Sequence, residues 1–333
     1  MVTSRKSRSR KKDTSPRVKS IKLDFTECQV TSFGGLALTE RLALRLGLWN
    51  YLRKLLPHRP GRYDWMDVLK PAIAGLLTGS RGTVACEEVR KDQALMDLLG
   101  VRGAPEETTF WRDLAKLGKR EMLELFEECQ RHWAQRLLRS VKRPQLQIHG
   151  FLPLFGDGSL LEGSARREGT KYIKNKGEGL MWATWFVGPI LAAQRLAGEG
   201  EGEASCLRQT LAAVLRDVVE PLKLREKTLA LLDSLHGDGP TLEQLESEAL
   251  KYVVGANKLD KTTRLLEERS EHEWRERGAR SGWGWSESAV CACWIQCEGW
   301  EHKRLLIGRR WRENDELPSM AYHYSGVITN LRE

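Results

Sequence analysis

The sequence lacks an apolar segment long enough to cross a membrane, and it lacks a secretory signal. Its longest mostly apolar window, residues 180–193, has 14 residues and contains Gly188-Pro189. A membrane-spanning helix needs about 20 apolar residues. The basic N-terminus is not followed by the apolar core that a secretory signal requires. We therefore expect a buried strand and turn in this window, no membrane partner and a cytoplasmic location.

Cysteine is sparse as well. The chain has seven cysteines, an odd number, and they are scattered along it. Domains that depend on disulfides carry paired cysteines at short, regular spacings. The sequence thus excludes a disulfide-stabilised secreted domain and predicts a protein of a reducing compartment.

Acidic residues are outnumbered. The chain has 54 Lys and Arg against 45 Asp and Glu, a net charge of +9. Eight basic residues fall within the first 20, which contain one acidic residue, Asp13, and almost nothing apolar. This composition predicts a disordered basic tail over residues 1–30, which either follows DNA phosphates or is simply solvated. A basic chain favours a polyanionic partner, nucleic acid before membrane.

Residues 31–140 are predicted to form an all-α, helix-turn-helix-like domain. Apolar residues recur at helical spacing, and Gly residues punctuate them, which predicts helices over 36–56, 64–79, 83–100 and 104–118. Asp64 is the expected N-cap of the second helix, and Pro71 is expected to kink it or mark a later start.

The helix beginning near Pro105 is the candidate recognition helix of this domain. Thr108, Thr109 and Arg112 are expected to be exposed on it and to contact DNA. A helical packing domain without any groove contact is the alternative.

Residues 141–257 change to a mixed α/β pattern. Strand-like runs cover 144–163, 170–177 and 180–191, followed by a helical stretch, a strand at 228–233, a helix and a strand at 252–256. The order βββ-α-β-α-β combines a meander with parallel crossovers. We therefore predict the α/β fold class, with an RNase H-like mixed sheet.

Residues 258–333 are predicted to be a β-rich insertion. Residues 287–311 have the pattern of a hairpin with its turn near Glu298-Gly299, and six of the twelve tryptophans lie between Trp274 and Trp311. These tryptophans either form the core of a small sheet or stack on nucleic-acid bases.

Two aspartates follow apolar runs at the strand ends where functional groups gather in α/β sheets. Asp157 follows the first strand and Asp233 ends the fourth, and in RNase H-like topology these strands are neighbours. A divalent cation, Mg²⁺ or Mn²⁺, relieves the repulsion between close carboxylates and supports phosphoryl transfer. A single aspartate in such a position is better explained as a turn residue, and it is the pair in this strand order that favours catalysis. Asp238, in a Gly-Asp-Gly turn, is the alternative second acid.

The segments "FGDGSLLEGSARREGTKYIKNKGEG", "LLDS" and "KYVVGANK" resemble the catalytic core of DDE transposases of bacterial insertion sequences, in the branch that carries a β-strand insertion. The resemblance covers the chain from about residue 30 to its end. It implies metal-dependent cleavage and strand transfer at element ends, with Asp157 and Asp233 as the first two acids. Double-stranded DNA (inverted repeats and target) is the implied partner. A homodimer in a synaptic complex and a nucleoid-associated location are further expectations.

The family's third acid is a glutamate on a helix after the insertion, and Glu333 comes too early to match it. We therefore expect a C-terminally truncated copy with impaired activity. The alternatives are a non-catalytic DNA-binding remnant that inhibits an intact transposase, and a nuclease or resolvase on the same fold.

Two further groups of side chains are candidates for binding. Basic residues near the site and on the insertion either contact DNA phosphates or are only a solvated face: Lys171, Lys174, Lys258, Arg309 and Arg310. The spacing of a second set is compatible with either zinc binding or a buried sheet face. Its members are Cys291, Cys293, Cys297 and His302.

Overall fold

The structure is a computed structural model that divides into two compact units. It describes residues 31, 33–79, 84–117, 120–162, 171–173, 177–198, 201–256, 260–276, 285–313 and 322–331. The first unit is drawn from residues 31–40 and Pro60–Phe110, and the second from Arg41–Arg59 and from Trp111 onward. The predicted basic tail, residues 1–30, lies outside the described residues.

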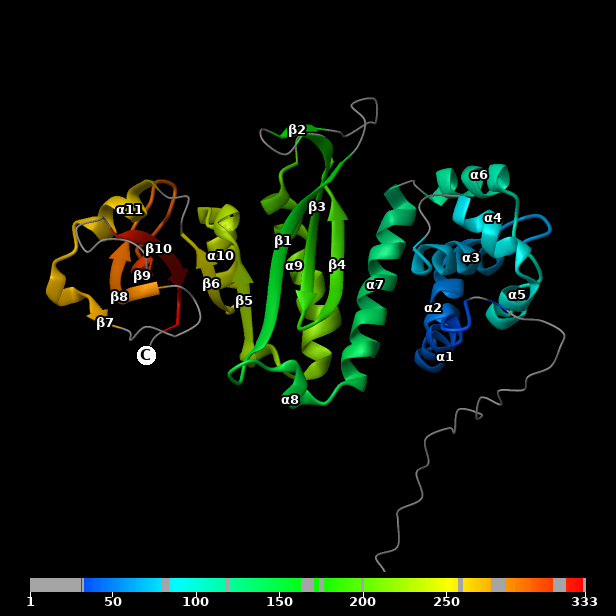
Figure 1. The fold of residues 1–333 in the computed structure, drawn as a ribbon, viewed down its shortest axis with the longest axis horizontal. Coiled ribbons are helices and arrows are strands. Elements are labelled where there is room, and N and C mark those ends of the chain that lie inside the picture. The colour runs from blue at the N-terminus through cyan, green and yellow to red at the C-terminus, as the bar shows by residue number, and fades with distance from the viewer. Residues whose placement is uncertain are drawn as a thin grey trace, which may run out of the picture. The chain divides into compact units, whose positions relative to one another are not determined.

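Helices make up the N-terminal part of the chain (Figure 1). They are α1 (Leu36–Leu46), α2 (Leu48–Leu55), α3 (Trp65–Leu77), α4 (Val84–Lys91), α5 (Gln93–Leu99), α6 (Glu107–Leu117), α7 (Arg120–Ser140) and α8 (Arg143–Leu146). An all-α region therefore precedes the sheet, as the sequence predicted.

The first unit has a small apolar core formed by α3, α4 and α5. Val89, Leu95 and Met96 are buried in it. Nearby, Nζ of Lys70 on α3 lies 2.7 Å from Oε1 of Glu40 on α1, and both side chains are buried. Breaking such a pair leaves an uncompensated buried charge, so it ties the start of α1 to α3.

Two of the predicted helices are each broken in two. Gly47 has a φ of 68° and separates α1 from α2, where the sequence predicted one helix over 36–56. Asp92 interrupts the helix predicted over 83–100, because its carboxylate caps α5 by accepting a hydrogen bond from the Leu95 N–H at 2.9 Å. Apolar periodicity runs through both breaks, which is why it does not reveal them.

Helix α3 begins at its predicted cap. Asp64 accepts a hydrogen bond from the Asp67 N–H at 2.9 Å, and the Asp67 side chain accepts one from the Asp64 N–H at 3.0 Å, which completes a capping box. The helix continues through Pro71 without ending. Helix α6 begins at Glu107, two residues after Pro105.

The second unit is built on one mixed β-sheet, against which helices pack. Its strands are β1 (Leu152–Glu162), β2 (Lys171–Ile173), β3 (Gly177–Val187), β4 (Ile190–Leu196), β5 (Thr228–Leu232), β6 (Lys251–Gly255), β7 (Arg275–Glu276), β8 (Trp285–Ile295), β9 (Arg304–Glu313) and β10 (His323–Thr329). The helices that follow α8 are α9 (Glu203–Val214), α10 (Gly239–Ser247) and α11 (Asp260–Glu267).

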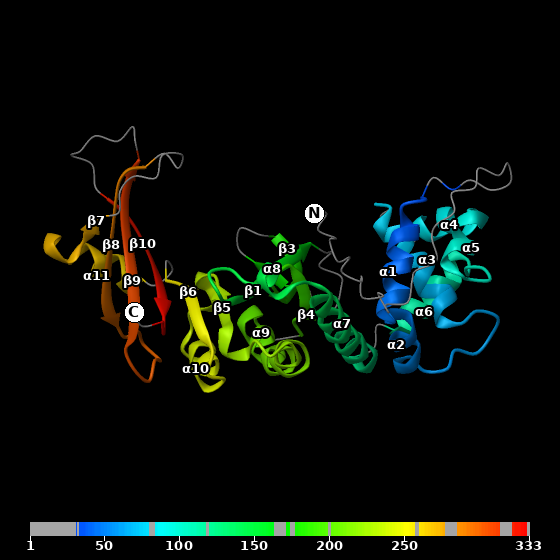
Figure 2. The same ribbon diagram turned by 90° about the horizontal axis from the view of Figure 1, so that it is seen from below.

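The strand order confirms the predicted RNase H-like fold class. Strands run β2-β3-β1-β5-β6-β10-β9-β8-β7, with β4 paired to β3. Strand β3 is antiparallel to β1 and to β4, whereas β1, β5 and β6 are mutually parallel neighbours. Helices α9 and α10 are the crossovers before and after β5, and both lie on the same face of the sheet (Figure 2).

The meander differs from the prediction in its details. The apolar run 180–191, predicted as one strand, contains the end of β3 and the start of β4, joined by a turn at Gly188, whose φ is 56°. The run predicted at 170–177 contributes the three-residue strand β2. Two strands and their turn are all apolar, so hydropathy alone does not separate them.

The β-rich insertion extends the same sheet. Strand β8 pairs with β9, β9 with β10, and β10 runs antiparallel to β6, with Val327 opposite Gly255. The hairpin turn is where it was predicted, and Gly299 has a φ of 78°. Trp274 and Trp300 are buried, which supports a core role for these two, while Trp294 is 58% exposed.

Candidate metal centre

The parallel pairing of β1 with β5 sets the positions of the two predicted acids. Gly156 of β1 is in register with Leu232 of β5. The residue that follows Gly156 is Asp157, and the residue that follows Leu232 is Asp233. Both aspartates are exposed. The sheet therefore places them at neighbouring positions at the carboxyl end of β5. Asp157 does not follow its strand as predicted but lies within it, because β1 continues to Glu162 in its pairing with β3.

Backbone N–H groups orient both carboxylates. The Gly158 N–H donates to Oδ1 of Asp157 at 2.8 Å. The Leu235 N–H donates to Oδ1 of Asp233 at 2.8 Å, because Asp233 caps the 3₁₀ turn Ser234–His236. Carboxylates held by N–H groups keep their remaining lone pairs available to a cation.

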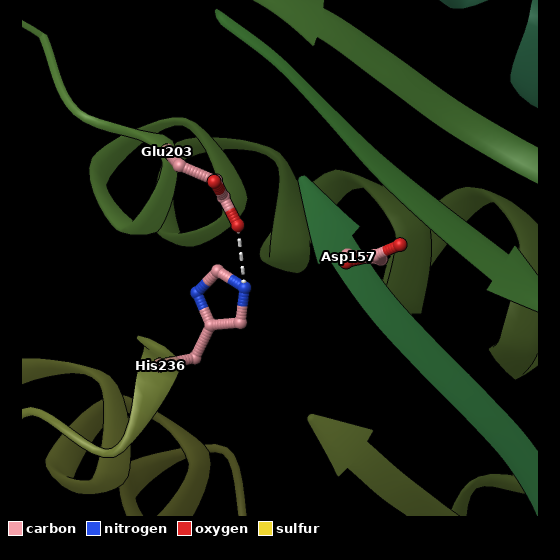
Figure 3. Close-up of side chains that lie close together, drawn as sticks. All are labelled: Asp157, Glu203 and His236. Atoms are coloured by element: carbon pink, nitrogen blue, oxygen red, sulfur yellow. Dashed lines mark ion pairs between the residues drawn. The ribbon is translucent and has the colours of Figure 1, made fainter. Parts of the chain in front are cut away.

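Two residues outside the predicted pair join the aspartates. Ligand atoms of Asp157, Glu203 and His236 all lie within 4.8 Å of one another. Asp157 comes from β1, Glu203 from the first turn of α9 and His236 from the turn after β5 (Figure 3). Nε2 of His236 lies 2.8 Å from Oε1 of Glu203 and 3.4 Å from Oδ1 of Asp233. The imidazole thus lies beside Glu203, which belongs to this group, and beside Asp233, which does not.

The imidazole is fully buried and makes no hydrogen bond to the described residues. His236 has 0% exposure, and the Glu203 side chain has 10%. Neither ring nitrogen of His236 has a hydrogen-bond partner in the described part of the chain, nor does Oε1 of Glu203. Most buried polar groups are satisfied, so an exception calls for an explanation such as an ion.

Gly158 makes room for the Glu203 carboxylate. A Cβ built on Gly158 would lie 1.7 Å from Cδ and 2.1 Å from Oε1 of Glu203. The glycine after Asp157 is therefore needed for the close approach of α9 to β1 at this point.

We expect Gly158→Ala to push Glu203 away from His236 and to lower the free energy of unfolding by about 1–2 kcal/mol, through overpacking. Gly202→Ala is the matched control, because a Cβ there meets nothing within 4 Å, and its cost at the helix N-cap is about 0.5 kcal/mol. Urea denaturation measures both. Equal stability of the Gly158 variant and the unmodified protein would contradict the packing described.

The donor set and its spacing suit a divalent cation. Ligand atoms about 2.1 Å from an octahedral ion, and at right angles to each other, are about 3.0 Å apart. The distance from His236 Nε2 to Glu203 Oε1, 2.8 Å, is close to that value, and the ligand atom of Asp157 lies within 4.8 Å of both residues' ligand atoms. Carboxylate oxygens and a neutral imidazole are ordinary ligands of such ions. The residues present therefore fit a metal ion.

Asp238, the alternative second acid, has other partners. It caps α10 by accepting a hydrogen bond from the Thr241 N–H at 3.2 Å. Its Oδ2 also accepts a hydrogen bond from Nη1 of Arg208 at 2.9 Å. These contacts account for Asp238 as a structural residue of the turn after β5.

The candidate recognition residues lie on α6. Thr108 and Arg112 are exposed and Thr109 is half-buried. Trp111, on the same helix face as Thr108 and Arg112, is 55% exposed. DNA contact by this face stays a prediction.

The basic candidates differ in their surroundings. Lys171 is the first residue of β2, while Lys174 and Lys258 lie outside the described residues. Arg309 on β9 is half-buried and donates from Nε to Oγ of Ser288 at 3.3 Å. Arg310 is buried and forms an ion pair with Glu271, in which Nη1 donates to Oε1 at 2.7 Å.

The four candidate zinc ligands do not form a metal-binding group among the described residues. Cys291 and Cys293 point to the same buried face of β8, and burial raises the pKa of the Cys291 thiol to about 11. Cys297 is half-buried, and Nε2 of His302 lies 3.2 Å from Oε2 of Glu246. The arrangement is that of a buried sheet face, the second of the two expectations.

Glu203 is the site residue that the sequence reasoning missed. It opens a helix just after Gly202, a position where an acidic residue is ordinary because it favours the helix dipole. Gly158 is the one sequence signal that could have indicated this contact. A glycine directly after Asp157 leaves room for a side chain from another element. In the sequence, His236 is one polar residue three positions after Asp233, where it could either assist at the site or be a hydrogen-bonded turn histidine.

No protein-family model matches the sequence, and no curated protein matches it either. Among solved structures, the chain is similar to the cryo-EM structure of a piggyBac transposase synaptic complex with hairpin DNA, with a TM-score of 0.38 and 12% identity. The match covers 92% of this chain and 55% of that chain, so this chain spans about half of that protein's length. Within the described residues, no helix is both long and apolar enough to cross a membrane.

Proposed function

We propose that this protein catalyses metal-dependent cleavage and strand transfer of DNA, as a DDE-type transposase of a bacterial insertion sequence. The observation that carries the proposal is the register of β1 and β5, which brings Asp157 and Asp233 to neighbouring positions beside the buried His236. Asp233 follows β5 directly and Asp157 lies beside it within the longer β1, and paired carboxylates on adjacent parallel strands are suited to hold cations against a phosphodiester.

The protein's own groups prepare this site. The N–H groups of Gly158 and Leu235 hold one oxygen of Asp157 and one of Asp233, which fixes how the two carboxylates face the substrate. Both aspartates are exposed, so a DNA backbone can reach them. A divalent cation held there would polarise the phosphodiester, promote ionisation of the attacking hydroxyl and stabilise the leaving oxygen.

The charge of the chain supports DNA as the substrate. The net charge is +9, and cationic proteins gain affinity for DNA by releasing counterions from its phosphates. The face of α6 with Thr108, Trp111 and Arg112 is the proposed contact for element ends. Binding that depends steeply on salt would be the expected signature of these contacts.

The test uses the full chain and duplex fragments that carry the DNA flanking its gene, with scrambled fragments as the control. With Mg²⁺ or Mn²⁺ we expect cleavage of the flanking DNA that leaves 3′-hydroxyl ends, and with EDTA none. Absence of cleavage by the folded protein with either metal would overturn the proposed activity. DNA binding without cleavage would favour a non-catalytic DNA-binding protein instead.

A further inference from the structure

We propose that Glu203 and His236 are direct metal ligands together with Asp157, and that this site prefers a divalent transition metal such as Mn²⁺ over Mg²⁺. The location of this site rests on the proposed function, whereas its ligands are argued from the contacts below. Glu203 thus adds a third carboxylate to those of Asp157 and Asp233. It comes from the crossover helix α9, which packs on β1 and β3.

The burial of His236 is the first step. Its side chain is fully buried, and neither nitrogen has a hydrogen-bond partner among the described residues. A buried imidazole without such partners loses its hydrogen bonds to water, and here it has close contacts with the Glu203 and Asp233 carboxylates in their place. Nε2 faces the Glu203 and Asp233 carboxylates, so an ion between these atoms would satisfy it.

The placement of Glu203 is the second step. Glu203 is the first residue of the 12-residue helix α9, and its side chain lies against the Cα of Gly158. Its Oε1 is buried without a hydrogen bond to the described residues. Gly158 thus leaves room beside Asp157 for a carboxylate whose buried Oε1 has no hydrogen-bond partner among the described residues.

Ligand chemistry decides which metal is favoured. Mg²⁺ binds oxygen and keeps much of its water, whereas imidazole suits transition metals. Two carboxylates and one imidazole within 4.8 Å therefore favour Mn²⁺ and related ions. The alternative is that no metal ion binds here, and that Glu203 and His236 form only a buried ion pair.

The test is an electron paramagnetic resonance titration of the full chain with Mn²⁺, in the absence of DNA. We expect one tight site whose affinity falls at least about tenfold in Glu203→Gln, as loss of a ligand costs no less than loss of a second-shell partner. Glu201→Gln is the matched control, since Glu201 accepts hydrogen bonds from the Gly198 N–H and the Gln209 side chain, outside the group. Mg²⁺ should displace Mn²⁺ only at higher concentration.

A second readout identifies the imidazole without any variant. Electron spin echo modulation of bound Mn²⁺ should show coupling to a histidine nitrogen. The proposal is overturned by absence of tight Mn²⁺ binding, by unchanged affinity in Glu203→Gln, or by absence of nitrogen coupling. Neither readout uses DNA, so DNA cleavage that persists despite these outcomes would leave the proposed function standing. Mn²⁺ bound as expected without DNA cleavage would instead overturn only the function.

Discussion

Replacing Asp157 or Asp233 by Asn is expected to lower the rate of DNA cleavage by about a thousandfold or more, which is about 4 kcal/mol of transition-state stabilisation. Each substitution removes a negative charge from the site and leaves the size of the side chain unchanged. The Gly158 and Leu235 N–H groups can still bond the amide oxygen, so folding should be retained. Single-turnover cleavage of the flanking DNA measures the loss.

Asp238→Asn is the matched control for Asp233→Asn. Asp238 lies five residues further along, caps α10 and pairs with Arg208. Asn caps helices as well as Asp does, so this variant should fold and retain most of its cleavage. If Asp238→Asn abolished cleavage while Asp233→Asn did not, the assignment of the second acid would be reversed.

Glu246→Gln is expected to lower the free energy of unfolding by about 3 kcal/mol, because it leaves a buried arginine without its countercharge. Nε and Nη2 of Arg304 donate to the two oxygens of Glu246 at 2.8 and 2.9 Å, and the Arg304 side chain is 2% exposed. This pair joins α10 to β9 and so holds the insertion on the core. Urea denaturation followed by tryptophan fluorescence measures the loss.

Glu248→Gln on the segment after α10 is the control. Its partner Arg225 is about a third exposed, and such pairs contribute less than about 1 kcal/mol. If both variants lost the same stability, the burial of Arg304 would not be the cause.

The same pair predicts a dependence of stability on pH. Burial by itself would raise the pKa of Glu246, but hydrogen bonds from Arg304 and Tyr252 outweigh it and lower the pKa below its usual range. A carboxyl with a lowered pKa in the folded state stabilises it above the ordinary pKa, and this stability is lost as the pH falls towards the folded value. The difference between the unmodified protein and Glu246→Gln should therefore shrink in acid.

The sequence was sufficient for the core of the sheet because its signals are local. β5 and β6 are short, mostly apolar runs and β1 begins with one, and helical stretches separate β5 from its neighbours in sequence, which predicts parallel crossovers. Asp157 and Asp233 were predicted as site residues because functional groups gather at strand ends in an α/β sheet, and their assignment stays a prediction. The parallel order then follows from topology without knowledge of any side-chain contact.

The remaining features depend on contacts that no local pattern carries. Glu203 reaches Gly158 only because α9 packs on β1, some 40 residues away in sequence. The burial of His236 likewise arises from its neighbours in space, and in sequence it is one polar residue in a turn. The turn at Gly188 lies between two apolar strands, so hydropathy merges them.

A crystal structure of the full chain grown with Mn²⁺, with anomalous scattering recorded at the manganese edge, places the ion directly. We predict an anomalous peak about 2.2 Å from carboxylate oxygens of Asp157 and Glu203 and from a nitrogen of His236, with Asp233 beside it. An ordered site without a peak, or a peak elsewhere on the protein only, would contradict the placement of a metal centre between β1 and β5.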